Sequence, residues 1–128
     1  MKTKIILITI MALTMMSLSC GKEKVVVTEL NTEFNLNFEQ TAEIKNEKLS
    51  IKFQTVSDSR CPKGANCIWQ GEGKVTLNVN STLVELSTLN PTKDTLGYHF
   101  LLISLLPEPD INKSITDNDY VLKMKVSK

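Results

Sequence analysis

Alternation of apolar and polar residues with a period of two is the feature that most constrains what this chain can fold into. Phe34, Leu36 and Phe38 alternate with asparagines, and the pattern recurs twice later in the chain. Successive side chains of a β-strand point to opposite faces, so this alternation predicts strands with one buried and one solvated face. The stretches that show it are 34–55, 74–80 and 120–127.

The segments between these stretches are rich in turn residues and predict a chain of short strands. Residues 88–97, TLNPTKDTLG, predict a long loop, and residues 98–106, YHFLLISLL, predict a strand buried on both faces. Residues 107–118, which have Pro107 and Pro109 at their start, predict a loop, with one short helix there as the alternative. The lysines of the last strand, 120–127, suit an exposed sheet edge.

These strand signals together predict an all-β fold. No ten-residue stretch after residue 20 shows a helical period as clean as the alternations. About seven short strands with turns between them indicate a small antiparallel β-sandwich or barrel.

The first twenty residues have the pattern expected of an export signal. Lys2 and Lys4 precede an unbroken run of apolar residues and Thr from Ile5 to Met16, followed by Ser17-Leu18-Ser19 and Cys20. The run is shorter than the roughly 20 apolar residues that a membrane-spanning helix needs. It resembles a bacterial lipoprotein signal peptide, in which the Cys after the cleavage point is lipidated, although Ser17 stands where an aliphatic residue is more usual. The alternative is an ordinary secretory signal that leaves Cys20 as a thiol.

The resemblance implies three segments: a removed signal peptide at 1–19, a lipidated N-terminus and tether at 20–32, with room for a first edge strand around its three valines, and an all-β domain at 33–128. Removing 1–19 takes away two lysines and no acid, so 15 basic residues become 13 against 14 acidic ones and the formal charge changes from +1 to −1. Such a chain has no electrostatic footprint for nucleic acid. Its expected membrane contact is the lipid on Cys20, and Gly21 favours the outer membrane within the cell envelope.

The remaining two cysteines, Cys61 and Cys67, predict one disulfide. An even number of cysteines in an exported chain indicates a bridge, and closing so short a loop stabilises a fold by about 2 kcal/mol. Two alternatives stay open. Structural zinc sites have C-x₂₋₄-C spacing and four ligands, and thioredoxin-type redox centres have C-x-x-C, whereas five residues separate this pair and the one histidine, His99, is distant in sequence.

The stretch DSRCPKGANCIWQGEG, residues 58–73, resembles a signature of small exported bacterial proteins, many of them predicted lipoproteins, that reads approximately DSRCPxxxxCxWxGE. Those proteins continue with an alternating strand, an L-x-P-x-P stretch and an Asp-Tyr before the last strand. The corresponding segments here are Leu106–Pro109 and Asp119–Val121. The resemblance spans most of residues 34–128. It implies fold and compartment and no particular activity.

Four side chains of the signature have both a structural and a binding interpretation: Asp58, Arg60, Trp69 and Glu72. In the structural one, Trp69 covers the disulfide and Arg60 pairs with Asp58 or Glu72. In the other, the rigid loop presents Arg60, Trp69 and Glu72 to a partner, because Trp and Arg are favoured interface anchors. We expect the structural role to come first.

Motifs for catalysis are lacking. The sequence has no G-x-S-x-G, no H-E-x-x-H and no phosphate-binding loop, and Asp117 and Asp119 are too few for a calcium site. We therefore expect no enzyme activity, no cofactor and no metal. The expected function is a lipid-anchored envelope lipoprotein that serves as a binding or assembly module with an envelope protein as partner. The alternatives are an inhibitor-like β-sandwich that docks its disulfide loop into an exported enzyme, and an enzyme of unrecognised type.

Overall fold

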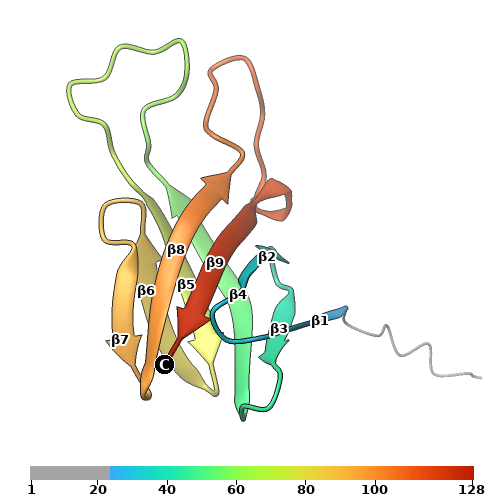
Figure 1. The fold of residues 1–128 in the computed structure, drawn as a ribbon. Helices are drawn as coiled ribbons and strands as arrows, with labels where there is room; N and C mark the ends of the chain where they lie inside the picture. Colours follow the sequence, from blue (N-terminus) through green and yellow to red (C-terminus); the bar gives the residue numbers. More distant parts are fainter. Residues whose placement is uncertain (1–23) are drawn as a thin grey trace, which may run out of the picture.

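Two open β-sheets packed face to face form the fold of residues 24–128, the part of the chain that this computed structural model describes (Figure 1). The all-β prediction is confirmed, and the architecture is a sandwich and not a closed barrel. The described residues form nine strands instead of about seven. The predicted signal peptide, residues 1–19, and Cys20 lie outside these residues. The first sheet contains β1 (Val25–Thr28), β3 (Thr41–Ile44), β4 (Leu49–Asp58), β5 (Gly73–Val79) and β6 (Thr82–Ser87), and the second contains β2 (Glu33–Asn37), β9 (Val121–Ser127), β8 (Tyr98–Leu106) and β7 (Thr92–Thr95), each in spatial order.

Neighbouring strands pair antiparallel in both sheets except at one edge, where β1 runs parallel to β3. β1 lies within the segment expected to be a tether, and it is the first edge strand expected there. Val25 pairs with Thr41, which in turn pairs with Lys52 of β4. The first residue of β1 therefore lies level with the middle of β4.

The core between the sheets consists of the apolar residues of the alternating stretches. Phe34 and Leu36 of β2, Phe53 of β4 and Met124 of β9 are buried, and their polar neighbours face outward. The rings of Phe38 and Phe53 form an edge-to-face pair with centroids 5.5 Å apart. Period-two patterning thus predicted which face of each strand is buried.

Three expectations about individual segments are wrong. β8 is not buried on both faces, because no third layer covers the outer side of a two-layer sandwich, and Ile103 is 38% exposed there. β9 lies between β2 and β8 instead of at an edge, and Lys123 and Lys125 occupy its outer face. The predicted loop at 88–97 contains the short strand β7, which pairs with β8.

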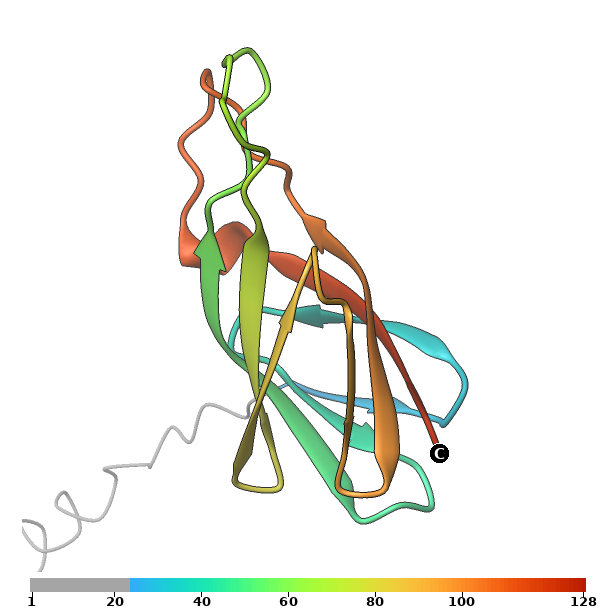
Figure 2. The ribbon, with the colours of Figure 1, turned by 90° about the vertical axis from the view of Figure 1, so that its left-hand side faces the viewer.

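Two long connections extend beyond the strands at one end of the sandwich. They join β4 to β5 (residues 59–72) and β8 to β9 (residues 107–120), and both views show them side by side (Figures 1 and 2). The second contains a 3₁₀ turn at Asp117–Asp119, where a short helix had been the alternative. We call these two connections together the loop end. Among residues 24–128, none of the helical structure is long and apolar enough to cross a membrane.

A clamped loop end as the candidate functional site

The two connections of the loop end are hydrogen-bonded to each other. The backbone N–H of Lys63 donates to the Pro109 carbonyl at 2.8 Å, and the N–H of Ile111 donates back to the Lys63 carbonyl at 3.2 Å. The β4–β5 ladder also continues past the ends of its strands, because the N–H of Cys61 donates to the Gln70 carbonyl at 2.8 Å. Backbone hydrogen bonds therefore hold the base of the loop end.

Arg60 is the side chain that joins these segments. Its Nε and Nη2 donate to the two carboxylate oxygens of Asp58 at 2.8 and 2.7 Å, which is a bidentate ion pair. Its Nη1 donates to the Leu105 carbonyl at 2.9 Å, and Nη2 also donates to the Pro107 carbonyl at 3.0 Å. One guanidinium thereby connects the end of β4 to the end of β8.

Tyr120 completes the arrangement from the third segment. Its hydroxyl donates to Asp58 Oδ2 at 3.0 Å, and its ring belongs to the buried core. We call Asp58, Arg60 and Tyr120 the Arg60 clamp. The clamp unites three parts of the chain that the sequence resemblance had marked separately, namely the DSRC, L-x-P-x-P and Asp-Tyr segments.

Burial and hydrogen bonding set the protonation states in the clamp. Burial raises the pKa of the Asp58 carboxyl, but the hydrogen bonds from Arg60 and Tyr120 and the charge of Arg60 outweigh it, so the net pKa lies below its ordinary value. The hydrogen bond to Asp58 raises the pKa of Arg60 despite partial burial. Burial, together with the neighbouring carboxylate, raises the pKa of Tyr120 to about 12. The ion pair and a neutral tyrosine are therefore the stable state at neutral pH.

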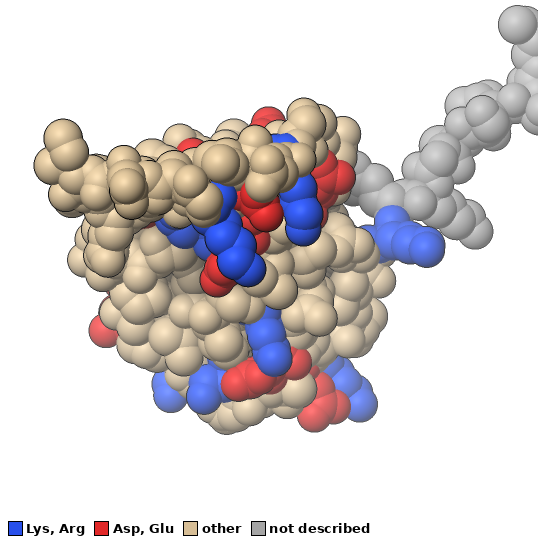
Figure 3. All heavy atoms as spheres, turned by 90° about the horizontal axis from the view of Figure 1, so that it is seen from above, with Lys and Arg blue, Asp and Glu red and all other residues tan. Residues whose placement is uncertain are grey.

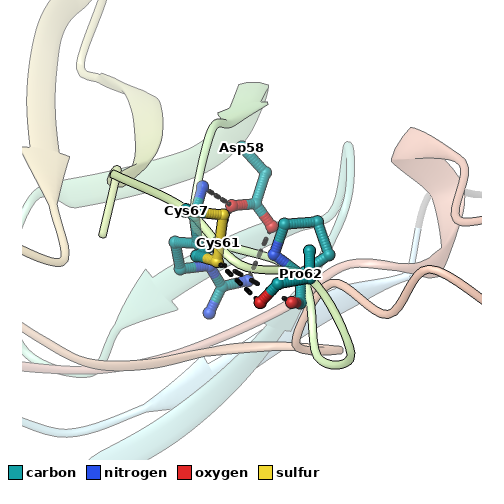
Figure 4. Close-up of a disulfide and its surroundings, with 6 residues drawn as sticks. Asp58, Cys61, Pro62 and Cys67 are labelled. Carbon is teal, nitrogen blue, oxygen red and sulfur yellow. Dashed lines mark hydrogen bonds and ion pairs between the residues drawn. A yellow bond between two sulfur atoms is a disulfide. The ribbon is translucent and has the colours of Figure 1, made fainter. Parts of the chain in front are cut away.

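Cys61 and Cys67 form the predicted disulfide, with Cα atoms 5.8 Å apart (Figure 4). The two cysteines are thus bonded to each other and are not a pair of metal ligands. The bridge closes a turn that contains Pro62, whose carbonyl accepts a hydrogen bond from the N–H of Ala65 at 3.1 Å. Figure 4 shows the bridge beside Pro62, whose carbonyl oxygen lies 3.8 Å from Cys61 Sγ.

Gly71 fixes the path of the chain as it leaves the loop. Its φ is +66°, and a Cβ placed on it would lie 1.7 Å from the carbonyl oxygen of Ser59. Only glycine fits where the two backbone segments approach so closely.

Trp69 is not the buried anchor of the loop that the structural interpretation expects. Its side chain is 65% exposed, and its neighbour Ile68 is fully exposed. Residues 66–69 form no hydrogen bonds among the described part of the chain, so the disulfide at Cys67 is the cross-link that holds them. The loop end therefore presents two adjacent large apolar side chains to solvent on a cross-linked segment.

Glu72 takes no part in the clamp. Its carboxylate lies 3.4 Å from Lys74 Nζ on the following strand, while Arg60 is fully engaged by Asp58 and the two carbonyls. Of the four signature residues, the structure brings Asp58 and Arg60 together, and it places Trp69 and Glu72 apart from them.

A groove of about 460 Å³ runs along the base of the loop end. Leu89 and Pro109 contribute apolar surface to its lining, and Lys63 and Glu108 contribute one charge of each sign. Seen from above, basic and acidic side chains are interspersed over this end of the molecule (Figure 3). The face seen in this view has no extended region of one charge.

The remaining ionisable groups that the sequence suggested have structural partners. His99 contacts Asp94 on the exposed β7–β8 hairpin. Asp119 accepts hydrogen bonds from the backbone N–H and the hydroxyl of Thr116 at 2.8 and 3.0 Å, which is turn chemistry. Within residues 24–128, no group of three or more His, Cys, Asp or Glu side chains is arranged to hold a metal ion.

Comparison of the chain with protein-family models, curated proteins and solved structures finds no match. Sequence reasoning missed two residues of the candidate site. Ile68 could have been found as an apolar residue between a cysteine and a tryptophan in an otherwise polar loop. The bond from Tyr120 to Asp58 spans 62 residues and leaves no local signal.

Proposed function

We propose that this protein is a lipid-anchored lipoprotein of the cell envelope, and that its β-sandwich is a non-catalytic binding module that contacts a protein partner through the loop end. The observation that carries the binding role is the exposure of Ile68 and Trp69 on a cross-linked, clamped segment. The signal sequence ending in Cys20 supports the anchor. The resemblance of residues 58–73 to exported bacterial proteins supports the compartment.

The physics of association favours this role for the loop end. Tryptophan is enriched among residues that dominate binding energy, because its large ring excludes water over a wide area. Each flexible side chain or loop ordered on binding costs about 0.5–1.5 kcal/mol, and a segment that is already held avoids part of that cost. The disulfide holds the segment, and the Arg60 clamp holds the base of the loop end, before any partner arrives.

The chemistry of the clamp supports a binding role more than catalysis. Asp58 and Arg60 are saturated by each other, by Tyr120 and by two backbone carbonyls. A general base needs an available carboxylate or imidazole at the site, and the Asp58 carboxylate already accepts several hydrogen bonds. The titratable groups of the clamp therefore serve to position the loop.

A photo-crosslinking side chain placed at Ile68 in cells that produce the full chain tests the binding role. The matched control places it at Leu83, which is 62% exposed on β6 at an outer edge of the first sheet. We expect a discrete adduct from position 68 and none of the same size from position 83. No adduct at position 68, or the same adducts at both positions, would contradict the proposal.

The anchor has its own test. Replacing Cys20 by Ala removes the only acceptor for the lipid, so the protein should move from the membrane fraction to the soluble fraction. Membrane association that is unchanged in Cys20→Ala would mean that lipid on Cys20 does not hold the protein.

An inhibitor-like module is the second candidate, and the shape of the loop favours it. Ile68 and Trp69 protrude instead of lining a pocket, so the complementary surface of a partner is concave. The identity of the adduct separates the two candidates. An exported hydrolase crosslinked through its active-site cleft supports inhibition, and a structural envelope protein supports assembly.

A further inference from the structure

We propose that strand β1 lies against the lipid surface that carries the protein, so that the loop end is turned away from that surface toward the aqueous compartment. This inference rests on the proposed lipidation of Cys20. It adds an interaction surface, the outward side of β1, whose partner is the bilayer itself.

The tether between the lipid and the domain is short. Val25 is already paired in the sheet, so at most five Cα-to-Cα steps separate it from the lipid on Cys20. An extended chain spans at most about 3.6 Å for each residue, so Val25 lies within about 18 Å of its anchor in any conformation of the intervening chain.

The loop end lies farther from β1 than the tether can reach. Val25 is level with Lys52, and β4 runs on from there through Asp58 to the hydrogen-bonded Cys61. At about 3.3 Å for each residue, this path covers about 30 Å. The tether is shorter than this path, so the domain cannot stand on its loop end on the membrane that anchors it.

The outward side of β1 is apolar. Val26 packs against the core and Thr28 is buried, while Val25 and Val27 point outward and are 45% and 67% exposed. These valines lie beside the point where the tether joins the domain, at the free edge of the first sheet. A short tether therefore holds an apolar edge next to the bilayer, whose headgroup region accepts such side chains.

Fluorescence of single tryptophans tests this arrangement, because Trp69 is the only tryptophan in the chain. The full-length protein is purified from membranes, the lipid on Cys20 is verified by mass, and the protein is placed in vesicles whose acyl chains carry a bromine quencher. The emission of Trp69 should be unaffected by the lipid quencher and lost to aqueous acrylamide. In a Trp69→Phe/Val27→Trp variant, the lipid quencher should remove most of the emission.

The matched control is Trp69→Phe/Leu83→Trp. Leu83 lies on β6 at the opposite edge of the first sheet, four strand spacings or about 19 Å from β1. Its emission should resist the lipid quencher. A flexible insertion of Gly and Ser residues after Glu23 should also relieve the quenching at position 27, because it lengthens the tether.

The outcomes distinguish the lipid anchor from the orientation of the domain. Absence of lipid on Cys20 overturns the anchor and this inference together. A lipidated protein in which Trp69 is quenched by lipid, or in which positions 27 and 83 are quenched equally, leaves the anchor standing and overturns the orientation.

Discussion

Replacing Arg60 by Ala removes the connection between the ends of β4 and β8. The variant loses two charge-assisted bonds to Asp58 and the donors to the Leu105 and Pro107 carbonyls. It also leaves the Asp58 side chain, which is 6% exposed, without its cation. Breaking a buried ion pair from one side costs about 3–5 kcal/mol. Because the Arg60 side chain retains 16% exposure, we expect a loss near the lower limit of that range.

Urea unfolding followed by far-ultraviolet circular dichroism measures this loss. Small domains have a total stability of about 5–15 kcal/mol, so the variant should unfold at a much lower urea concentration. The matched control is Lys74→Ala. Lys74 pairs with Glu72 at 3.4 Å and Glu85 at 3.8 Å with 47% of its side chain exposed, and such exposed pairs contribute about 0–1 kcal/mol.

A double-mutant cycle isolates the pair itself. Asp58→Ala removes the stranded carboxylate, so the double variant should be destabilised by less than the sum of the two single variants. Equal stability of Arg60→Ala and Lys74→Ala, or strict additivity of the Arg60→Ala and Asp58→Ala changes, would show that the clamp does not stabilise this end of the sandwich.

Three further changes test the loop end and its surroundings. Gly71→Ala should destabilise the protein more than Gly97→Ala in thermal melts, since both have positive φ but only at Gly71 would a Cβ meet backbone, whereas nothing lies within 4 Å at Gly97. Replacing Cys61 and Cys67 together by Ala should cost about 2 kcal/mol in urea unfolding through lost loop closure, and an unchanged midpoint would show that the bridge does not constrain the unfolded chain. The pKa of Asp58 is lower in the folded protein than its ordinary value of 3.8. The ionised Asp58 carboxylate therefore stabilises the fold above pH 3.8, and this stabilisation is lost as the pH falls through the folded pKa. In urea titrations at several pH values, the stability of Asp58→Asn should thus decline less steeply with acid than that of the parent.

The strands were predictable because their evidence is local. Alternation at Phe34–Phe38 and at 120–127 specifies a buried face from neighbouring residues alone, and the structure buries that face. The order of strands within each sheet depends on contacts between residues that are far apart in the sequence. β9 therefore emerged at the centre of its sheet although its lysines suggested an edge.

The candidate site likewise has features that the local sequence predicts and features that it does not. The disulfide followed from counting cysteines, and the Asp58–Arg60 pair follows from two residues that are nearly adjacent. The exposure of Trp69 depends on where the loop leaves the sandwich, which no spacing in the sequence reports. An aromatic residue near a disulfide suggested a cover, but this loop extends beyond the core and has no core beneath it to cover.

We propose that Trp69 contacts a partner and that the Arg60 clamp stabilises the fold. Measuring both the stability and the binding of one Trp69→Ala protein tests these two roles together. We expect an unfolding midpoint close to that of the parent, because changes at exposed positions usually stay within about 0.5 kcal/mol. We also expect loss of the crosslinked adduct formed from position 68. A destabilisation of about 3–5 kcal/mol, the cost of removing a buried tryptophan, or an adduct that persists without Trp69 would contradict the proposal.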